Sequence, residues 1–136
     1  MKPFSQKEMK PWGYEVILAP PEAPASAKIL HVNQGHRSSL QYHEIKEETL
    51  ILIDGKAYLI YGPDKDNLTK VEMKPFKGYF IPKGLVHRYG GITDCDIFES
   101  SLKEDGTTYR LEDDYHRPNE TKESGEEERK KNLVKE

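Results

Sequence analysis

Short runs of alternating apolar and polar residues recur along most of this chain. They lie at residues 12–18, 27–33, 68–73, 78–81 and 95–101, and apolar runs lie at 50–53 and 57–61. Side chains leave alternate faces of a β-strand, so each run predicts a strand with one buried face. Gly-, Pro-, Asn- and Asp-rich turns separate the runs, at a spacing of roughly 8–12 residues that is typical of an all-β sandwich or barrel.

Two glycine turns carry more specific predictions. Asp54-Gly55 stands between two apolar runs, which is a strong signal for a two-residue hairpin. That hairpin would help to bring Glu48 back beside His43. A further strand begins at His87, and Gly90-Gly91 is expected to break it.

The two ends of the chain differ from the region between them. Residues 1–10 are charged and contain proline, so we expect an arm that lies along the domain or along a second subunit. Residues 1–117 are predicted to form one domain, followed by a charged tail at 118–136. An acidic block precedes a basic block in this tail, which favours a short helix. Only Leu133 and Val134 are available for burial, so the tail is expected to fray.

Composition narrows the class of partner. A chain of 136 residues is the size of one domain, and its net charge of −3 gives no general attraction to nucleic acid or to anionic membranes. No run approaches the roughly 20 apolar residues of a membrane span. Cys95 is the only cysteine, which excludes an internal disulfide and suits a reducing cytoplasm.

Four polar side chains form a candidate metal site. Gln41 and His43 are two apart on a predicted strand and therefore share a face, Glu48 follows five residues later, and His87 follows the turn at Pro82-Lys-Gly84. Imidazole, carboxylate and amide oxygen together suit one divalent ion: Zn first, with Mn, Fe, Co and Ni also allowed. With only four ligands from the protein, room remains beside the ion for water or substrate. Gln41 either binds the ion directly or faces a water bound to it.

The same residues resemble the two cupin motifs. Gly35, His43, Glu48 and Gly55 fall on the first motif, with Gln41 at the place of its first histidine. Pro82, Gly84 and His87 fall on the second, whose outer Gly and Asn are replaced by Phe76 and Gly91. The resemblance implies a single-domain all-β cupin, a double-stranded β-helix or jelly-roll barrel, that holds a metal.

Within the cupins, the chain looks most like the type II mannose-6-phosphate isomerases. The matching segments span residues 10–117, and they are Lys10-Pro-Trp-Gly-Tyr-Glu15, Ser39-Leu-Gln-Tyr-His43 with Glu48, Ile81-Pro-Lys-Gly-Leu-Val-His-Arg88, and Arg110-Leu-Glu-Asp-Asp-Tyr-His-Arg117. His116 replaces a glycine of that family, and Ser101 replaces a glutamine. The resemblance implies a cytoplasmic, metal-dependent enzyme of carbohydrate metabolism that interconverts mannose-6-phosphate and fructose-6-phosphate. Cupins often pair through edge strands, so a homodimer is expected.

This resemblance also suggests catalytic and substrate-binding residues. Glu99 stands where the family has a glutamate on an inward-facing strand and is the first candidate base, with Glu47 the second. Arg117 is expected to meet the phosphate or the enediolate. Further substrate contacts are expected from basic residues near the same rim, namely Arg37, Lys83, Arg88 and Arg110, while Glu112 and Asp113 hold the arginines in place.

Two other functions stay open at this point. The replacements at His116 and Ser101 favour a cupin that holds a sugar or another small ligand without turnover. A metal dioxygenase is a third reading, and it is weakened because glutamine replaces a histidine that iron oxygenases of this fold generally keep.

Overall fold

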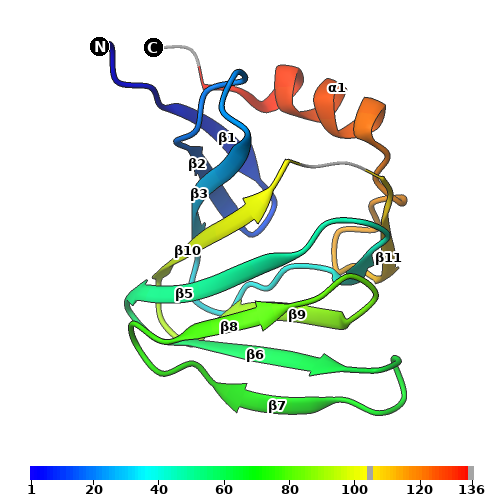
Figure 1. Cartoon of the computed structure of the whole chain (residues 1–136). Helices are drawn as coiled ribbons and strands as arrows, with labels where there is room; N and C mark the ends of the chain where they lie inside the picture. The colour runs from blue at the N-terminus through cyan, green and yellow to red at the C-terminus, as the bar shows by residue number, and fades with distance from the viewer. Residues whose placement is uncertain (104–105, 135–136) are drawn as a thin grey trace.

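The computed structural model describes residues 1–103 and 106–134, which form two antiparallel sheets and one helix (Figure 1). The strands are β1 (Gln6–Lys10), β2 (Gly13–Ile17), β3 (Ala25–Val32), β4 (Leu40–His43), β5 (Glu48–Asp54), β6 (Ala57–Gly62), β7 (Thr69–Glu72), β8 (Gly78–Ile81), β9 (Val86–Gly91), β10 (Cys95–Leu102) and β11 (Thr108–Glu112). One sheet has the order β1-β2-β3-β10-β5-β8, and the other has the order β11-β4-β9-β6-β7. This confirms the predicted all-β architecture.

The N-terminal segment is part of the larger sheet. Residues 6–10, expected to be an arm, form β1, which pairs antiparallel with β2 from Gln6 opposite Ile17 to Lys10 opposite Gly13. Glu8 is only 1% exposed, so the polar character of this segment did not reveal its burial. The result places Lys10 inside the fold.

The turn at Asp54-Gly55 is not a hairpin, which corrects the prediction. β5 pairs with β8 and β10, whereas β6 pairs with β7 and β9, so the chain crosses here from one sheet to the other. Gly55 has φ 74°, and a Cβ on it would lie 2.2 Å from the carbonyl oxygen of Asp94. The Asp-Gly pair supplies a left-handed turn, but it does not determine which strands pair afterwards.

The strand that begins at Val86 also runs on through Gly90 and Gly91, so the predicted break there is wrong. Gly90 pairs with Tyr58 of β6, and a Cβ on Gly90 would lie 2.2 Å from the ring carbon Cζ of Tyr58. The missing side chain makes room for this aromatic ring. Glycine here serves close packing within a strand.

The core lies between the inner faces of the two sheets. It contains aliphatic side chains that are almost fully buried, including Leu30, Val32, Leu50, Leu52, Leu59 and Ile97. Along β10 the side chains of Ile97, Glu99 and Ser101 are buried, whereas those of Phe98 and Ser100 lie on the other face. The buried face of β10 therefore contributes an apolar side chain, Ile97, to the core and polar side chains, Glu99 and Ser101, beside it.

The C-terminal segment packs against the domain, so the expectation that it frays is wrong. Thr121 caps helix α1 (Lys122–Asn132), which lies beside β1 and the larger sheet (Figure 1). None of its residues is buried; it is held by ion pairs such as Arg129–Glu8 at 3.2 Å and by a backbone bridge between Glu8 and Leu133. The last two residues of the predicted tail lie outside the described residues. No helix in residues 1–103 and 106–134 is long and apolar enough to cross a membrane.

Candidate metal centre and its cavity

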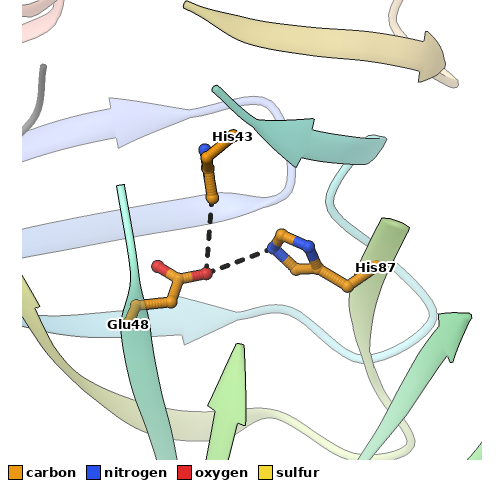
Figure 2. Close-up of side chains that lie close together, drawn as sticks. All are labelled: His43, Glu48 and His87. Atoms are coloured by element: carbon orange, nitrogen blue, oxygen red, sulfur yellow. Dashed lines mark ion pairs between the residues drawn. The ribbon is translucent and has the colours of Figure 1, made fainter. Parts of the chain in front are cut away.

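Two histidines and a glutamate from three strands converge at one buried point (Figure 2). His43 ends β4, Glu48 begins β5 and His87 lies in β9. The Nε2 atoms of His43 and His87 lie 3.5 and 3.1 Å from the same carboxylate oxygen, Oε1 of Glu48. His43 and His87 belong to the smaller sheet and Glu48 to the larger one, so the two-sheet packing brings them together.

The Nδ1 atoms of both histidines make contacts that orient the two rings towards this point. Nδ1 of His87 donates to the carbonyl oxygen of Leu85 at 2.9 Å, and Nδ1 of His43 lies 2.9 Å from Oγ1 of Thr108. Neither Nε2 atom has a hydrogen-bond partner within the described part of the chain. Burial, partly offset by Glu48, lowers the pKa of His43, so its ring is neutral near pH 7. Such second partners are the usual way in which a protein orients metal-binding histidines.

This geometry fits a divalent ion. The Nε2 atoms of both rings face the same carboxylate oxygen without a hydrogen bond, and a cation between the three atoms would contact all of them. Zinc bonds of about 2.0–2.1 Å in a tetrahedral arrangement put neighbouring ligand atoms roughly 3.3 Å apart. The observed separations of 3.1 and 3.5 Å are close to that value. We therefore assign His43, Glu48 and His87 as residues that can hold one metal ion.

A buried lysine links the metal centre to the candidate base. Nζ of Lys46 lies 3.3 Å from Oε2 of Glu48 and 3.3 Å from Oε2 of Glu99. Burial raises the pKa of Glu48, but Lys46 and the two histidines outweigh it and hold the net pKa well below its usual range. Burial dominates at Glu99 and, against the opposing effect of Lys46, raises its pKa to about 8. Two adjacent carboxylates thus have different protonation states near neutral pH.

The metal centre opens into a cavity of about 110 Å³ between the sheets and α1. Trp12 and Tyr89, packed edge to face at 5.6 Å, form an apolar part of its wall. The rest of the wall is mostly charged and includes Glu15, Lys46, Glu48 and Glu99. The basic residues Lys10, Arg110, Arg117 and Arg129 also line it, together with the start of α1.

The predicted site residues separate into two groups. Gln41, His43, Glu48, Glu99, Arg110 and Arg117 all line the cavity. Gln41 pairs in register with His87 across β4 and β9, and its Oε1 accepts a hydrogen bond from Ser39 at 2.8 Å. Direct binding of the metal by Gln41 stays a prediction.

Arg37, Lys83 and Arg88, by contrast, are not part of the cavity lining, so the expectation that they share this rim does not hold. Arg37 pairs with Asp114 at 2.8 Å, and the Nε of Arg88 donates to the carbonyl oxygen of Ser38. Arg88 follows His87 on β9, and alternation turns it to the other face. Lys83 is exposed in the turn after β8.

Glu47, the second candidate base, accepts a hydrogen bond from the backbone N–H of Lys83 and does not line the cavity. Lys46, Lys10 and Glu128 were missed by the sequence analysis. Lys46 lies between two motif residues, but its loop has no alternation to show which way it points. Nothing in the local sequence distinguishes Lys10 and Glu128 from ordinary surface charges.

Comparison with known proteins shows the fold. No model of a known protein family matches the chain, and no curated protein does. Oxalate decarboxylase of Lactobacillus farciminis, solved as a formate complex, superposes with a TM-score of 0.64 and 18% identity over 79% of this chain and 33% of its own. CapF, a capsular polysaccharide assembling protein from Staphylococcus aureus, gives 0.61 and 11% over 88% and 33%.

The present chain thus spans about a third of the length of either protein. Rru_A2000 of Rhodospirillum rubrum, a cupin-2 domain, gives a TM-score of 0.55 and 16% identity over 67% of this chain and 60% of its own. From these likenesses and the two-sheet topology, the chain has the single-domain, all-β fold of the cupins.

Proposed function

We propose that this chain is a metal-dependent isomerase of sugar phosphates that interconverts mannose-6-phosphate and fructose-6-phosphate. One observation carries the proposal: His43 and Glu48 of the metal centre, the buried Glu99 and a group of basic side chains all line the same cavity, and His87 is buried against Glu48. The sequence resemblance to type II mannose-6-phosphate isomerases supports the choice of substrate. Cupin-fold neighbours include proteins named as enzymes, among them oxalate decarboxylase.

Isomerisation of an aldose to a ketose moves a proton between C2 and C1 of the open-chain sugar. A metal ion, when bound, supplies a positive charge that polarises the carbonyl and the adjacent hydroxyl. Glu99 is the group of this chain best placed to carry the proton, because it is 5% exposed on the cavity wall beside the metal centre. Lys46 holds Glu99 and Glu48 in one arrangement by contacting both carboxylates.

Two arginines of the cavity wall suit the phosphate end of the substrate. Arg110 and Arg117 have side chains that are 6% and 15% exposed, and guanidinium groups bind phosphate through several directed N–H donors. Asp113 fixes Arg117, whose Nε lies 2.9 Å from its Oδ2. The sugar would then extend from the metal centre towards these arginines, with Trp12 alongside.

Turnover by the purified chain tests this proposal. The protein is stripped with EDTA, reloaded with Zn, Mn, Fe, Co or Ni, and incubated with mannose-6-phosphate while fructose-6-phosphate is measured. We expect activity that EDTA removes and metal restores. Glu99→Gln should reduce kcat by about 10²–10⁴-fold, the usual contribution of a general base. The matched control is Glu72→Gln, an exposed glutamate on β7, which should behave as wild type.

The other readings give different results in the same assay. Bound metal without turnover of any hexose or pentose phosphate would refute the isomerase and support a binding module. Oxygen consumption would support a dioxygenase. Full activity in Glu99→Gln would show that another group carries the proton.

A further inference from the structure

Three cations from separate parts of the chain surround one carboxylate of α1. Oε1 of Glu128 lies 3.7 Å from Nζ of Lys10 and 3.9 Å from Nη1 of Arg117. Oε2 of Glu128 lies 3.9 Å from Nη2 of Arg110. Lys10 comes from β1, Arg110 from β11 and Arg117 from the segment that follows β11. All three cations line the cavity that contains the metal centre.

This cationic cluster (Lys10, Arg110 and Arg117) is more buried than the carboxylate it surrounds. The side chains of Lys10 and Arg110 are 9% and 6% exposed, whereas that of Glu128 is 21% exposed. Nε of Arg110 is buried without a hydrogen-bond partner among the described residues. A buried guanidinium donor left unused on a cavity wall indicates that the cluster is built for a further anion.

The contacts of Glu128 with the cluster are loose. Charge-assisted N–H···O bonds are typically about 2.7–2.9 Å long, as in the Arg117–Asp113 pair at 2.9 Å. The contacts to Glu128, at 3.7–3.9 Å, are all longer. Glu128 presents two oxygens to three cations, each of which also contacts a second carboxylate: Lys10 contacts Glu8, Arg110 contacts Glu120 and Arg117 contacts Asp113. A phosphate group has three terminal oxygens and about twice the charge, so it matches the cluster better.

The size of the cavity gives an independent reason for α1 to move. Pockets that enclose small organic ligands usually have volumes of roughly 300–1,000 Å³. This cavity has about 110 Å³, and six residues of the C-terminal segment line it: Glu120, Thr121, Lys122, Gly125, Glu126 and Arg129. α1 contributes no buried residue of its own and is held by ion pairs and one backbone bridge. A shift of the helix towards solvent therefore breaks polar contacts and removes none of its own side chains from the apolar core.

We infer that Lys10, Arg110 and Arg117 form the binding site for the phosphate group of the substrate, and that Glu128 occupies this site until the phosphate displaces it. The identity of the substrate rests on the proposed function, whereas the anion site and its occupation by Glu128 can be tested without turnover. In this scheme α1 is a lid whose own carboxylate competes with the ligand. The apparent affinity for phosphate is reduced by the fraction of chains in which Glu128 occupies the site.

Calorimetric titration with inorganic phosphate tests the site directly. The full chain is used in EDTA, so that bound metal does not contribute, and wild type is compared with Glu128→Gln and Glu127→Gln. Glu127 is an exposed neighbour on the same helix and serves as the matched control. We expect Glu128→Gln to bind phosphate about three- to tenfold more tightly than wild type, the range given by removing one or two weak ion pairs. Glu127→Gln should bind like wild type.

Two further measurements complete the test. Adding Arg110→Gln to the Glu128→Gln chain should weaken phosphate binding at least tenfold. Hydrogen exchange of the α1 amides should speed up when phosphate binds to wild type, because the helix loses one of its anchors. Circular dichroism and thermal unfolding establish that each variant is folded before it is titrated.

Several results would overturn the inference. Equal phosphate affinity in wild type and Glu128→Gln would show that Glu128 does not occupy the site. Acetate binding as tightly as phosphate would refute the assignment to a phosphate group, and unchanged binding in the Arg110 variant would place the site elsewhere. The two proposals fail separately. Phosphate binding as predicted without turnover refutes only the isomerase, while turnover with the same KM in Glu128→Gln refutes only the lid.

Discussion

Replacing Lys46 by methionine removes the cation that two buried carboxylates share while keeping the length of the side chain. Lys46 is 7% exposed, and its Nζ lies 3.3 Å from both Glu48 and Glu99. Removing one partner of a buried ion pair costs about 3–5 kcal/mol, because the remaining charge loses its compensation. With its pKa near 8, Glu99 is mostly protonated at pH 7, so only Glu48 is left uncompensated. The lower end of that range, about 3 kcal/mol, therefore applies.

For a domain of this size, that loss corresponds to a Tm lower by roughly 10 °C. The assay is thermal unfolding of EDTA-treated protein, with Lys77→Met, an exposed lysine between β7 and β8, as the control. Surface substitutions usually change stability by less than about 0.5 kcal/mol. Adding zinc should recover part of the loss, because the metal charge compensates Glu48. A Lys46→Met chain as stable as the control in EDTA would refute the shared ion pair.

Three other predictions concern stability and reactivity. Phe76 and His116 have φ of 57° and 55°, a backbone conformation that costs a non-glycine residue about 1–2 kcal/mol. Replacing either residue by glycine should therefore raise the free energy of unfolding, measured in urea, by roughly 0.5–1 kcal/mol. Replacing either by alanine should not. Cys95 is 1% exposed, and burial raises its pKa to about 11. The native chain should therefore resist a thiol reagent at pH 8 and react with it after unfolding. Fast labelling of the native protein would contradict this prediction. Burial raises the pKa of Asp113, but Arg117 outweighs burial and the net pKa is lowered. Asp113→Asn should therefore destabilise the chain near pH 6. The difference in stability between wild type and Asp113→Asn should shrink as pH falls below about 4. A difference independent of pH would count against the ion pair.

The candidate metal centre could be predicted from the sequence because the spacing of its residues within two motifs is visible there, whereas the sheet packing that joins the motifs is not. Strand alternation and motif spacing identified His43, Glu48 and His87, and the structure brings these three together. Phe76 and His116 add to this picture. Both stand where the resembled families have glycine, and both have the left-handed backbone that glycine adopts most readily.

The pairing of the strands could not be predicted in the same way. Asp54-Gly55 has the chemistry of a hairpin turn, yet it joins two sheets, because pairing is decided by long-range packing of apolar faces. The Gly90-Gly91 pair was expected to end a strand, and only the ring of Tyr58 explains its presence inside one. Turn residues indicate local backbone geometry and leave the topology undetermined.

The charged part of the cavity was the least visible from the sequence. Lys10 and Glu128 are more than a hundred residues apart, and each lies in a polar segment that suggests a solvated surface. Ion pairs between β1, β11 and α1 bring them together, and no periodicity encodes these pairs. For the same reason Arg37 and Lys83 were expected at the site and lie elsewhere.

Metal binding by His43, Glu48 and His87 tests the central claim most directly. Zinc is titrated into EDTA-stripped protein after the chelator has been removed, and the bound metal is counted by elemental analysis for wild type and for His43→Ala/His87→Ala. His31→Ala/His36→Ala, which removes two histidines outside the site, is the control. We predict one ion per chain in wild type and in the control, and none in the His43/His87 variant. Absence of bound metal in wild type, or one ion in the His43/His87 variant, would contradict the account.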